Sequence, residues 1–256
     1  MTITYVTITY NAAAVLQRTL DSVLQQDYRD IVHLIIDGAS TDDTLQLVDD
    51  YIQRSNAGDN GHRIQVTSEP DDGIYDAMNK GLRSLDGDYV CFLNAGDFLP
   101  ASDTVSKIAS AVSQGDTPAV LYGDTDIVDT EGCFLRHRRL APPEHLTWKS
   151  FRHGMLVCHQ AFYARTDFAI ATPYDLHYRY SADVDWCIRI MKAAAKESVP
   201  LLDLHMVVAN YTEEGQTTLH HRESLLERFH VMTRHYGWLS TIAMHVWFVL
   251  RSLLRI

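Results

Sequence analysis

Hydrophobic residues in the first half of the chain follow two alternating patterns. ITYVTITY (3–10) and VHLIID (32–37) are continuous β-branched and aromatic runs, which predict buried strands. Between them, apolar residues recur every three or four positions across 15–24, which predicts a helix. The alternation continues with a strand at 63–69, a helix at 73–85 and a strand at 88–95. Strands that alternate with helices predict a parallel sheet.

The pattern changes from parallel to mixed after Pro100. AVLYGDTDIV (119–128) and CFLRHRR (133–139) predict a hairpin across the turn DTEG. Ser40 and Asp43 are spaced as a capping box for the helix after the second strand. The remaining predicted elements are a helix after Pro100, a strand at 157–165, a helix at 181–197, a strand at 199–211 and helices at 218–236 and 238–254. The predicted fold class is α/β, with a mixed, mostly parallel central sheet flanked by helices and with C-terminal helices.

Composition restricts the ligand classes. The chain has 33 acidic and 22 basic residues and a formal net charge of -11, so its overall field repels nucleic acid. An anionic ligand would need local cations or a metal. The pattern at the start, a strand directly after Met1, is not that of a signal peptide, and no long uncharged apolar run occurs. Four well-separated cysteines without a CxxC pair predict reduced core thiols in a cytosolic protein: Cys91, Cys133, Cys158 and Cys187.

Polar residues follow the carboxyl ends of the predicted parallel strands, which is where ligands bind in open α/β sheets. The polar residues at any one strand end are typical of a turn or a helix cap, but polar residues at four strand ends together indicate one crevice. No GxGxxG, P-loop, GxSxG or HExxH motif is present. Asp97 is a hard oxygen ligand suited to Mg²⁺ or Mn²⁺ with a diphosphate, and its alternative role is to cap the helix after Pro100. The strand-end residues are Thr9, Tyr10, Asn11, Asp37, Glu69 and 94–97.

The ordered motifs VTITYN, IIDGASTDDT, SEPDDGIYDAMNKG, DYVCFLNAGD and SADVDWCIR resemble the family 2 glycosyltransferases. The resemblance implies a GT-A fold and inverting transfer of a sugar from a nucleotide diphosphate donor. It implies a catalytic domain at 1–217, with a nucleotide-binding half (1–100) and an acceptor-binding half (101–217). A helical extension at 218–256 would follow.

The resemblance also implies roles for individual positions. Asp97 matches the last aspartate of the family's metal motif, which implies Mg²⁺ or Mn²⁺ as the cofactor. Asn94 and Gly96 stand where aspartates are common, so one carboxylate remains at the metal. The residues implied to bind the donor are Thr9, Tyr10, Asn11, Asp37, Glu69, Asp76, Asn79, Asn94 and Asp97.

The motif SADVDW matches the family's acidic segment near the acceptor, whose aspartate is the general base. The match falls on Asp183, although Asp185 lies in the same predicted first turn, where acidic side chains also stabilise a helix. Inverting displacement needs one such base and no enzyme nucleophile. The residues implied to bind the acceptor are His159, Gln160, Asp185 and Trp186.

The tail at 238–256 is aromatic and aliphatic, with Arg251 and Arg255. Two interpretations stay open: a helix lying on the inner face of the cell membrane, which suits a polyprenyl-linked acceptor, or a helix packed on the catalytic domain or on a second copy in a dimer.

The leading hypothesis is a bacterial hexosyltransferase of polysaccharide biosynthesis, in the cytoplasm or peripheral to the membrane. It would move a sugar from a UDP-, GDP- or dTDP-linked donor to a glycan or lipid-linked hydroxyl. One alternative is a non-catalytic nucleotide-sugar-binding or scaffold subunit, because the metal motif is reduced. A sugar nucleotidyltransferase is less favoured, because TYNAAAV (9–15) lacks the Gly- and basic-rich loop of that class.

Overall fold

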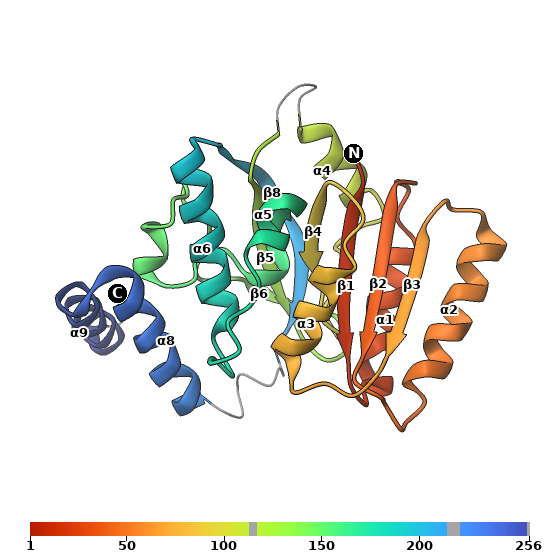
Figure 1. Ribbon diagram of the computed structural model, residues 1–256, viewed down its shortest axis with the longest axis horizontal. Coiled ribbons are helices and arrows are strands. Elements are labelled where there is room, and N and C mark those ends of the chain that lie inside the picture. The colour runs from red at the N-terminus through yellow and green to blue at the C-terminus, as the bar shows by residue number, and fades with distance from the viewer. Residues whose placement is uncertain (113–116, 214–220, 255–256) are drawn as a thin grey trace.

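The structure is a computed structural model that describes residues 1–112, 117–213 and 221–254. Its strands form one sheet in the order β3-β2-β1-β4-β7-β5-β6, and β8 pairs with β5 (Figure 1). The strands are β1 (Ile3–Thr9), β2 (Ile31–Asp37), β3 (Arg63–Ser68), β4 (Tyr89–Phe92), β5 (Val120–Val128), β6 (Phe134–His137), β7 (Phe162–Arg165) and β8 (Leu201–Thr212).

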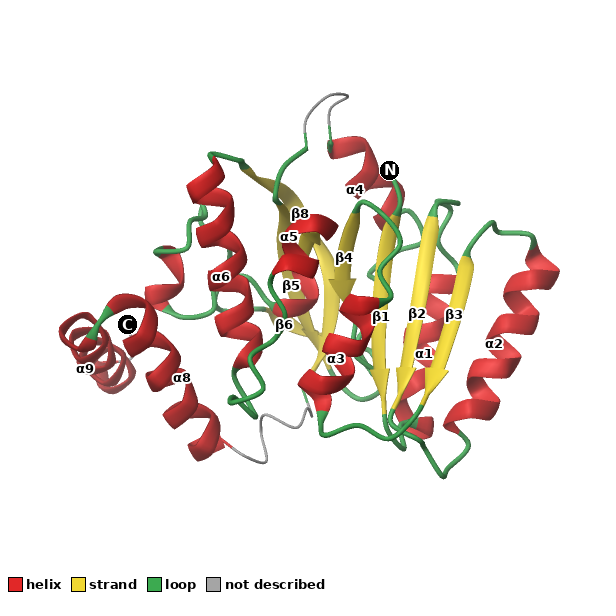
Figure 2. Ribbon diagram, viewed as in Figure 1, coloured by secondary structure: helices red, strands yellow, loops and turns green. Residues whose placement is uncertain are grey.

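Helices cover both faces of the parallel half of the sheet (Figure 2). Ile35 of β2 packs with Leu16 and Leu20 of α1 and with Val48 and Tyr51 of α2. The α3 helix contacts β1 and β2 from the other face. Strands buried on both faces must be apolar throughout, which explains the continuous runs in β1 and β2. The helices are α1 (Ala13–Leu24), α2 (Thr44–Gly58), α3 (Ile74–Arg83), α4 (Thr104–Ala111), α5 (Thr166–Ala171), α6 (Ala182–Glu197), α8 (His221–Tyr236) and α9 (Trp238–Leu254), with 3-10 turns η1 (Ser150–His153) and η2 (His159–Ala161).

The second half of the sheet is mixed, as predicted. β5 and β6 form the expected antiparallel hairpin, and β8 runs parallel to β5 along its length. β7 pairs with the start of β5, while β6 pairs with its end. Because β8 takes one edge of β5, β6 and β7 share the other edge.

The strand predicted at 157–165 is shorter in the structure. Only Phe162–Arg165 is a strand, and His159–Ala161 forms η2. The side chains of His159 and Gln160 are both buried, whereas successive side chains of a strand point to opposite faces. The turn therefore replaces the strand where two adjacent polar residues both face inward.

The predicted core position of the cysteines is confirmed for two of them. Cys91 and Cys187 are buried, Cys158 is half-buried, and all four thiols are free. The prediction is wrong for Cys133, which is exposed because it lies in the tight turn between β5 and β6.

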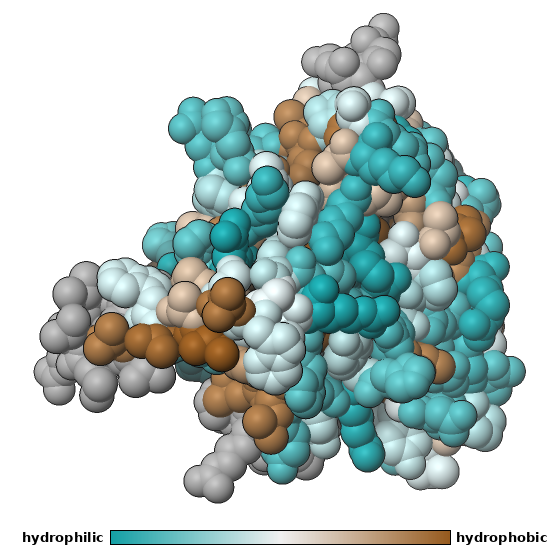
Figure 3. All heavy atoms as spheres, turned by 60° about the vertical axis from the view of Figure 1, so that its left-hand side comes forward, coloured by the Kyte–Doolittle hydropathy of each residue, from teal (hydrophilic) through white to brown (hydrophobic). Residues whose placement is uncertain are grey.

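The C-terminal helices lie to one side of the sheet, where α8 packs on α6 and α9 contacts α8 and η1 (Figure 1). Gly237 divides them at a φ of +81°, a conformation that glycine adopts without strain. Apolar side chains gather on the surface over α8 and α9 (Figure 3). Within the described residues, no helix has the length and apolar character needed to span a bilayer.

Candidate active site

Asp37 ends β2, where the parallel register sets it beside Thr9 of β1 and Ser68 of β3. Its carboxylate accepts hydrogen bonds from the hydroxyls of Thr9 (3.0 Å) and Ser68 (2.6 Å). It also accepts from the N–H (2.9 Å) and hydroxyl (2.5 Å) of Ser40. Burial acts to raise the pKa of Asp37, but these hydrogen bonds outweigh it and hold the pKa below its ordinary value. The carboxylate is therefore ionised and held in one orientation.

Ser40 has a different role from the predicted capping box. The α2 helix begins at Thr44, and its N-cap residue Asp43 makes no side-chain cap bond. Asp42 instead accepts from the N–H (3.0 Å) and hydroxyl (2.5 Å) of Thr44. The prediction was wrong because the Asp37 carboxylate, three residues before Ser40, competes for its hydroxyl.

The loop after β1 presents the predicted residues Tyr10 and Asn11. Tyr10 is 67% exposed. Asn11 adopts a left-handed φ of +47°, and its side-chain oxygen accepts the N–H of Thr41 (2.9 Å). Gly38 lies against both this loop and the segment after β3, since an added Cβ would lie 3.3 Å from the Tyr10 ring and 2.5 Å from a carboxylate oxygen of Asp71. The prediction did not name Asp71, which lies beside Gly38, the residue just after the end of β2.

Lys80 offsets the charge of the acidic segment that leads into α3. Its Nζ lies 3.0 Å from Glu69 Oε1 and 3.9 Å from Asp76 Oδ2, and it donates to the carbonyl of Pro70 (2.6 Å). The prediction named Glu69 and Asp76 but omitted Lys80. A cation of this kind is what an anionic ligand requires in an acidic protein.

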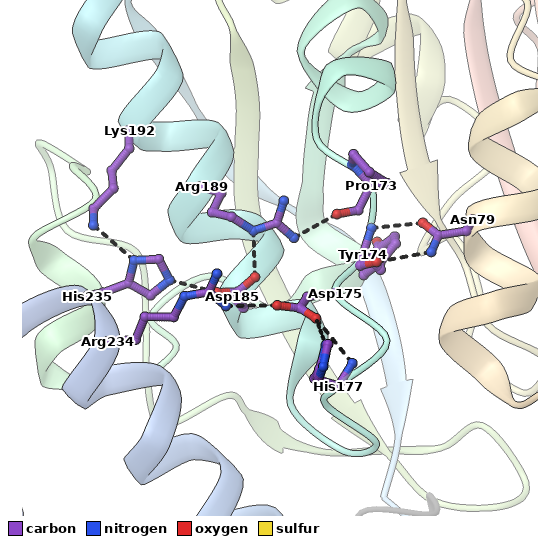
Figure 4. A network of polar contacts seen from close by, with 10 residues as sticks. All are labelled: Asn79, Pro173, Tyr174, Asp175, His177, Asp185, Arg189, Lys192, Arg234 and His235. Carbon is purple, nitrogen blue, oxygen red and sulfur yellow. Dashed lines mark hydrogen bonds and ion pairs between the residues drawn. The ribbon is translucent and has the colours of Figure 1, made fainter.

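Asn79 is predicted to bind the donor, and the structure shows its side chain bound to the backbone of Tyr174. Its side-chain oxygen accepts the N–H of Tyr174 (2.8 Å), and its Nδ2 donates to the carbonyl of Tyr174 (3.0 Å) (Figure 4). These two hydrogen bonds use both the oxygen and the nitrogen of the buried Asn79 amide, and they join α3 to the segment after α5.

Asp97 follows β4 and is only 5% exposed. Its Oδ2 accepts from Nε2 of Gln160 (2.6 Å), and its Oδ1 accepts from the N–H of Thr212 (3.1 Å). Burial raises the pKa of Asp97 to about 7, against the lowering effect of these hydrogen bonds. Gln160, predicted at the acceptor, is therefore a partner of the candidate metal ligand.

Asn94 supplies a second oxygen near the end of β4. Its Oδ1 is buried and has no hydrogen-bond partner among the described residues. A buried carbonyl oxygen without a partner and a carboxylate with a raised pKa both fit a divalent cation. The described residues contain no cluster of three His, Cys, Asp or Glu side chains, so phosphate oxygens of a donor would have to complete the coordination.

Asp183 lies half-buried in the first turn of α6 and accepts a hydrogen bond on Oδ1 from the Tyr75 hydroxyl (3.2 Å). The negative charges of Asp97 and Asp183 both affect the pKa of Cys158 and of Tyr211. After burial, both carboxylates raise the pKa of the Cys158 thiol, and both help to raise the pKa of Tyr211 to about 12. Both carboxylates therefore lie close enough to Cys158 and Tyr211 to raise the pKa of these two side chains.

The residues predicted to bind the acceptor are not on the surface. Trp186 stacks on Tyr174 at 5.0 Å between ring centroids, and Nε2 of His159 lies 2.7 Å from the Tyr174 hydroxyl. Asp185 pairs with Arg189 and with a histidine of α8 (Figure 4). Contact of these residues with an acceptor stays a prediction. The four side chains, each at most 5% exposed, are His159, Gln160, Asp185 and Trp186.

A groove of about 640 Å³ borders the backbone around Asp97 from the side of α1. Its lining includes Gln17, Arg18, Gly96 and Thr212. Gly96 belongs to the strand-end residues, but none of the residues predicted to bind the donor, the acceptor or the metal lines this groove.

The family model for glycosyl transferase family 2 matches residues 4–170 of the chain. The protein belongs to this family. A relative of this glycosyltransferase, the PGL/p-HBAD biosynthesis glycosyltransferase of Mycobacterium bovis, is 34% identical over 212 residues, which are 81% of this chain and 75% of that protein.

Two solved structures share the fold of this family 2 glycosyltransferase. S. aureus TarS in complex with UDP matches with a TM-score of 0.68 at 16% identity, over 91% of this chain and 64% of that chain. The mannosyltransferase PcManGT of Pyrobaculum calidifontis, in complex with GDP-Man and Mn²⁺, matches with a TM-score of 0.62 at 18% identity, also over 91% and 64%. The predicted GT-A fold is confirmed, and the chain spans less than two thirds of either protein.

Proposed function

We propose that this glycosyltransferase inverts the anomeric carbon of a nucleotide-diphosphate sugar in a single displacement. An acceptor hydroxyl forms the new bond to the anomeric carbon, its proton passes to Asp183, and the bonding electrons of the broken bond leave with the diphosphate. The observation that carries this proposal is the hydrogen bond from the Tyr75 hydroxyl that holds Asp183 by one oxygen, together with the buried Asp97 carboxyl after β4.

The hydrogen bond from Tyr75 suits Asp183 to the role of the base. It occupies Oδ1 of the carboxylate and leaves Oδ2 for the acceptor hydroxyl. Asp185 does not suit the role, because its side chain is fully buried and its two oxygens pair with Arg189 and His235.

The donor would lie along the carboxyl ends of β1, β2 and β4, over Asp37, Tyr10 and Lys80. A bound Mg²⁺ or Mn²⁺ would neutralise charge on the leaving diphosphate. Asp97 and Asn94 are the residues to hold it. The Mn²⁺ in the PcManGT complex supports the binding of a divalent cation by similarity of fold.

The proposal extends to a membrane surface as the place where a lipid-linked acceptor is met. Large apolar side chains of α9, each at least 45% exposed, form one stripe (Figure 3). Residues 238–256 contain arginine and no acidic residue in a chain of net charge -11, which favours an anionic bilayer. The stripe consists of Trp238, Leu239, Ile242, Val246, Trp247 and Leu250.

Donor binding tests the proposal. UDP-, GDP- and dTDP-sugars would be screened for their effect on the melting temperature, with Mn²⁺ and with a chelator. We expect one nucleotide class to raise it by several degrees in Mn²⁺, because a ligand of the native state alone stabilises that state.

Asp97→Asn should lose the Mn²⁺-dependent part of the stabilisation. The matched control is Asp50→Asn, at an exposed position on α2, and it should retain the full effect. Equal Mn²⁺ dependence in all three proteins would remove Asp97 as the metal ligand, and no stabilisation by any nucleotide would remove the donor site.

A further inference from the structure

The α8 helix binds the backbone that leads into Asp183. The carboxylate of Glu227 accepts three backbone N–H groups, from Arg179 (2.8 Å), Tyr180 (2.6 Å) and Ser181 (3.0 Å). Hydrogen bonds to an ionised acceptor are stronger than neutral ones. One side chain of the C-terminal extension thus fixes three consecutive peptide groups, and the last is two residues before Asp183.

The start of α6 depends on this contact because it has no side-chain cap of its own. Its N-cap residue Ser181 makes no capping hydrogen bond, and the Ser181 hydroxyl donates instead to the carbonyl of Ser224 in α8 (3.2 Å). Glu227 supplies the negative charge that an N-terminus favours. Two independent contacts therefore join the first turn of α6 to α8.

Two ion pairs from the end of α8 bracket the same segment (Figure 4). Arg234 Nη1 lies 2.8 Å from Asp175 Oδ2, and this contact is the main reason that the pKa of Asp175 is lowered to about 2. His235 Nε2 lies 2.7 Å from Asp185 Oδ1. Asp183 lies between the two points at which α8 holds the chain.

The Asp185 contact has a defined direction. Nδ1 of His235 lies 2.9 Å from Nζ of Lys192, and a charged lysine is a donor only. Nδ1 must then accept, so Nε2 carries the proton and donates to Asp185. The ring accordingly links α8 to two successive parts of α6.

We infer that α8 is part of the catalytic apparatus and that Glu227 is a positioning residue for Asp183. This inference rests on the proposed function, in which Asp183 is the base. Glu227 touches no reacting atom. It fixes the backbone from which Asp183 projects, so that the carboxylate stays at the distance that proton transfer requires.

The test is Glu227→Gln, which keeps the length of the side chain but replaces one acceptor oxygen with a donor and removes the charge. We expect amide hydrogen exchange at 179–181 to become about 10-fold faster, because the bound N–H groups open more often. We expect kcat to fall about 10-fold while KM for the donor stays unchanged. Glu223→Gln, at an exposed position one turn earlier on α8, should change neither quantity.

A second variant tests the same inference in case Glu227→Gln does not fold. Ser181→Ala removes the hydroxyl contact to Ser224 and should shift exchange and kcat in the same direction by a smaller factor. Faster exchange with unchanged kcat would overturn the positioning role, and unchanged exchange in Glu227→Gln would overturn the contact itself. Normal turnover in Asp183→Asn would instead refute the proposed function, while the exchange result would still report on α8.

Discussion

Asp97 is a buried carboxyl group that has two hydrogen-bond donors and no cation among its described partners. Its pKa in the folded protein is about 7, against an ordinary value of 3.8. Between these two values the native state binds a proton that the unfolded chain has already released. The free energy of unfolding therefore falls as pH rises from about 4 to 7, by on the order of a few kcal/mol.

We predict this pH dependence for the metal-free protein and its absence in Asp97→Asn, whose amide does not titrate. The melting temperatures of both proteins would be measured from pH 4 to 8 in a chelator and compared as a difference. Adding Mn²⁺ should stabilise the wild type above pH 7, where Asp97 is ionised, more than below it. A difference that stays flat with pH would contradict the assigned environment of Asp97.

Individual residues differed in how far the sequence could place them. Asp37 and Asp97 could be proposed as site residues because polar residues follow several predicted parallel strands, although each alone is also typical of a turn or a helix cap. The partners of Asp37 were not, because Ser68 reaches it only through strand register. Asn79 and Trp186 were assigned to ligands, yet both bind Tyr174, whose position depends on how α3 and α6 pack together.

The first turn of α6 explains how two aspartates in one motif can take separate roles. Successive helical residues are about 100° apart, so Asp183 and Asp185 project to nearly opposite sides. One meets Tyr75 of α3, and the other meets His235 of α8. The spacing alone could not decide which side faced the ligand, because both candidates satisfied the same helical position preference.

The apolar stripe on α9 predicts binding to lipid vesicles. Ile242→Asp and Val246→Asp place a charge in the stripe and should each lower the fraction of protein that sediments with vesicles containing phosphatidylglycerol. Ile170→Asp is the matched control, because Ile170 is comparably exposed but lies on α5. It should sediment like the wild type.

Vesicles of phosphatidylcholine alone should bind less protein, because the cationic tail is attracted by anionic lipid. Equal sedimentation of all the variants would refute membrane contact. Dissociation of a dimer by the two α9 variants, without any vesicle binding by the wild type, would show that the stripe is an interface between copies.

The architecture of the whole molecule followed from the sequence more completely than the site. Buried parallel strands and amphipathic helices leave strong periodic patterns, so the alternation in the first half and the break at Gly237 were predictable. The order of the strands in the sheet could not be predicted, because periodicity within a segment does not say which segments lie side by side. The docking of α8 on α6 could not be predicted for the same reason, since it joins residues about 50 positions apart in sequence, such as Arg179 and Glu227.

The central claim is that Asp183 accepts the proton of the acceptor hydroxyl while the rest of the molecule holds the donor. The direct measurement compares kcat and the donor dissociation constant of Asp183→Asn with those of the wild type. We predict that kcat falls by about 100-fold or more while the donor dissociation constant is nearly unchanged. Asp167→Asn, an exposed aspartate at the start of α5, serves as the control. Near-normal turnover of Asp183→Asn would contradict the account.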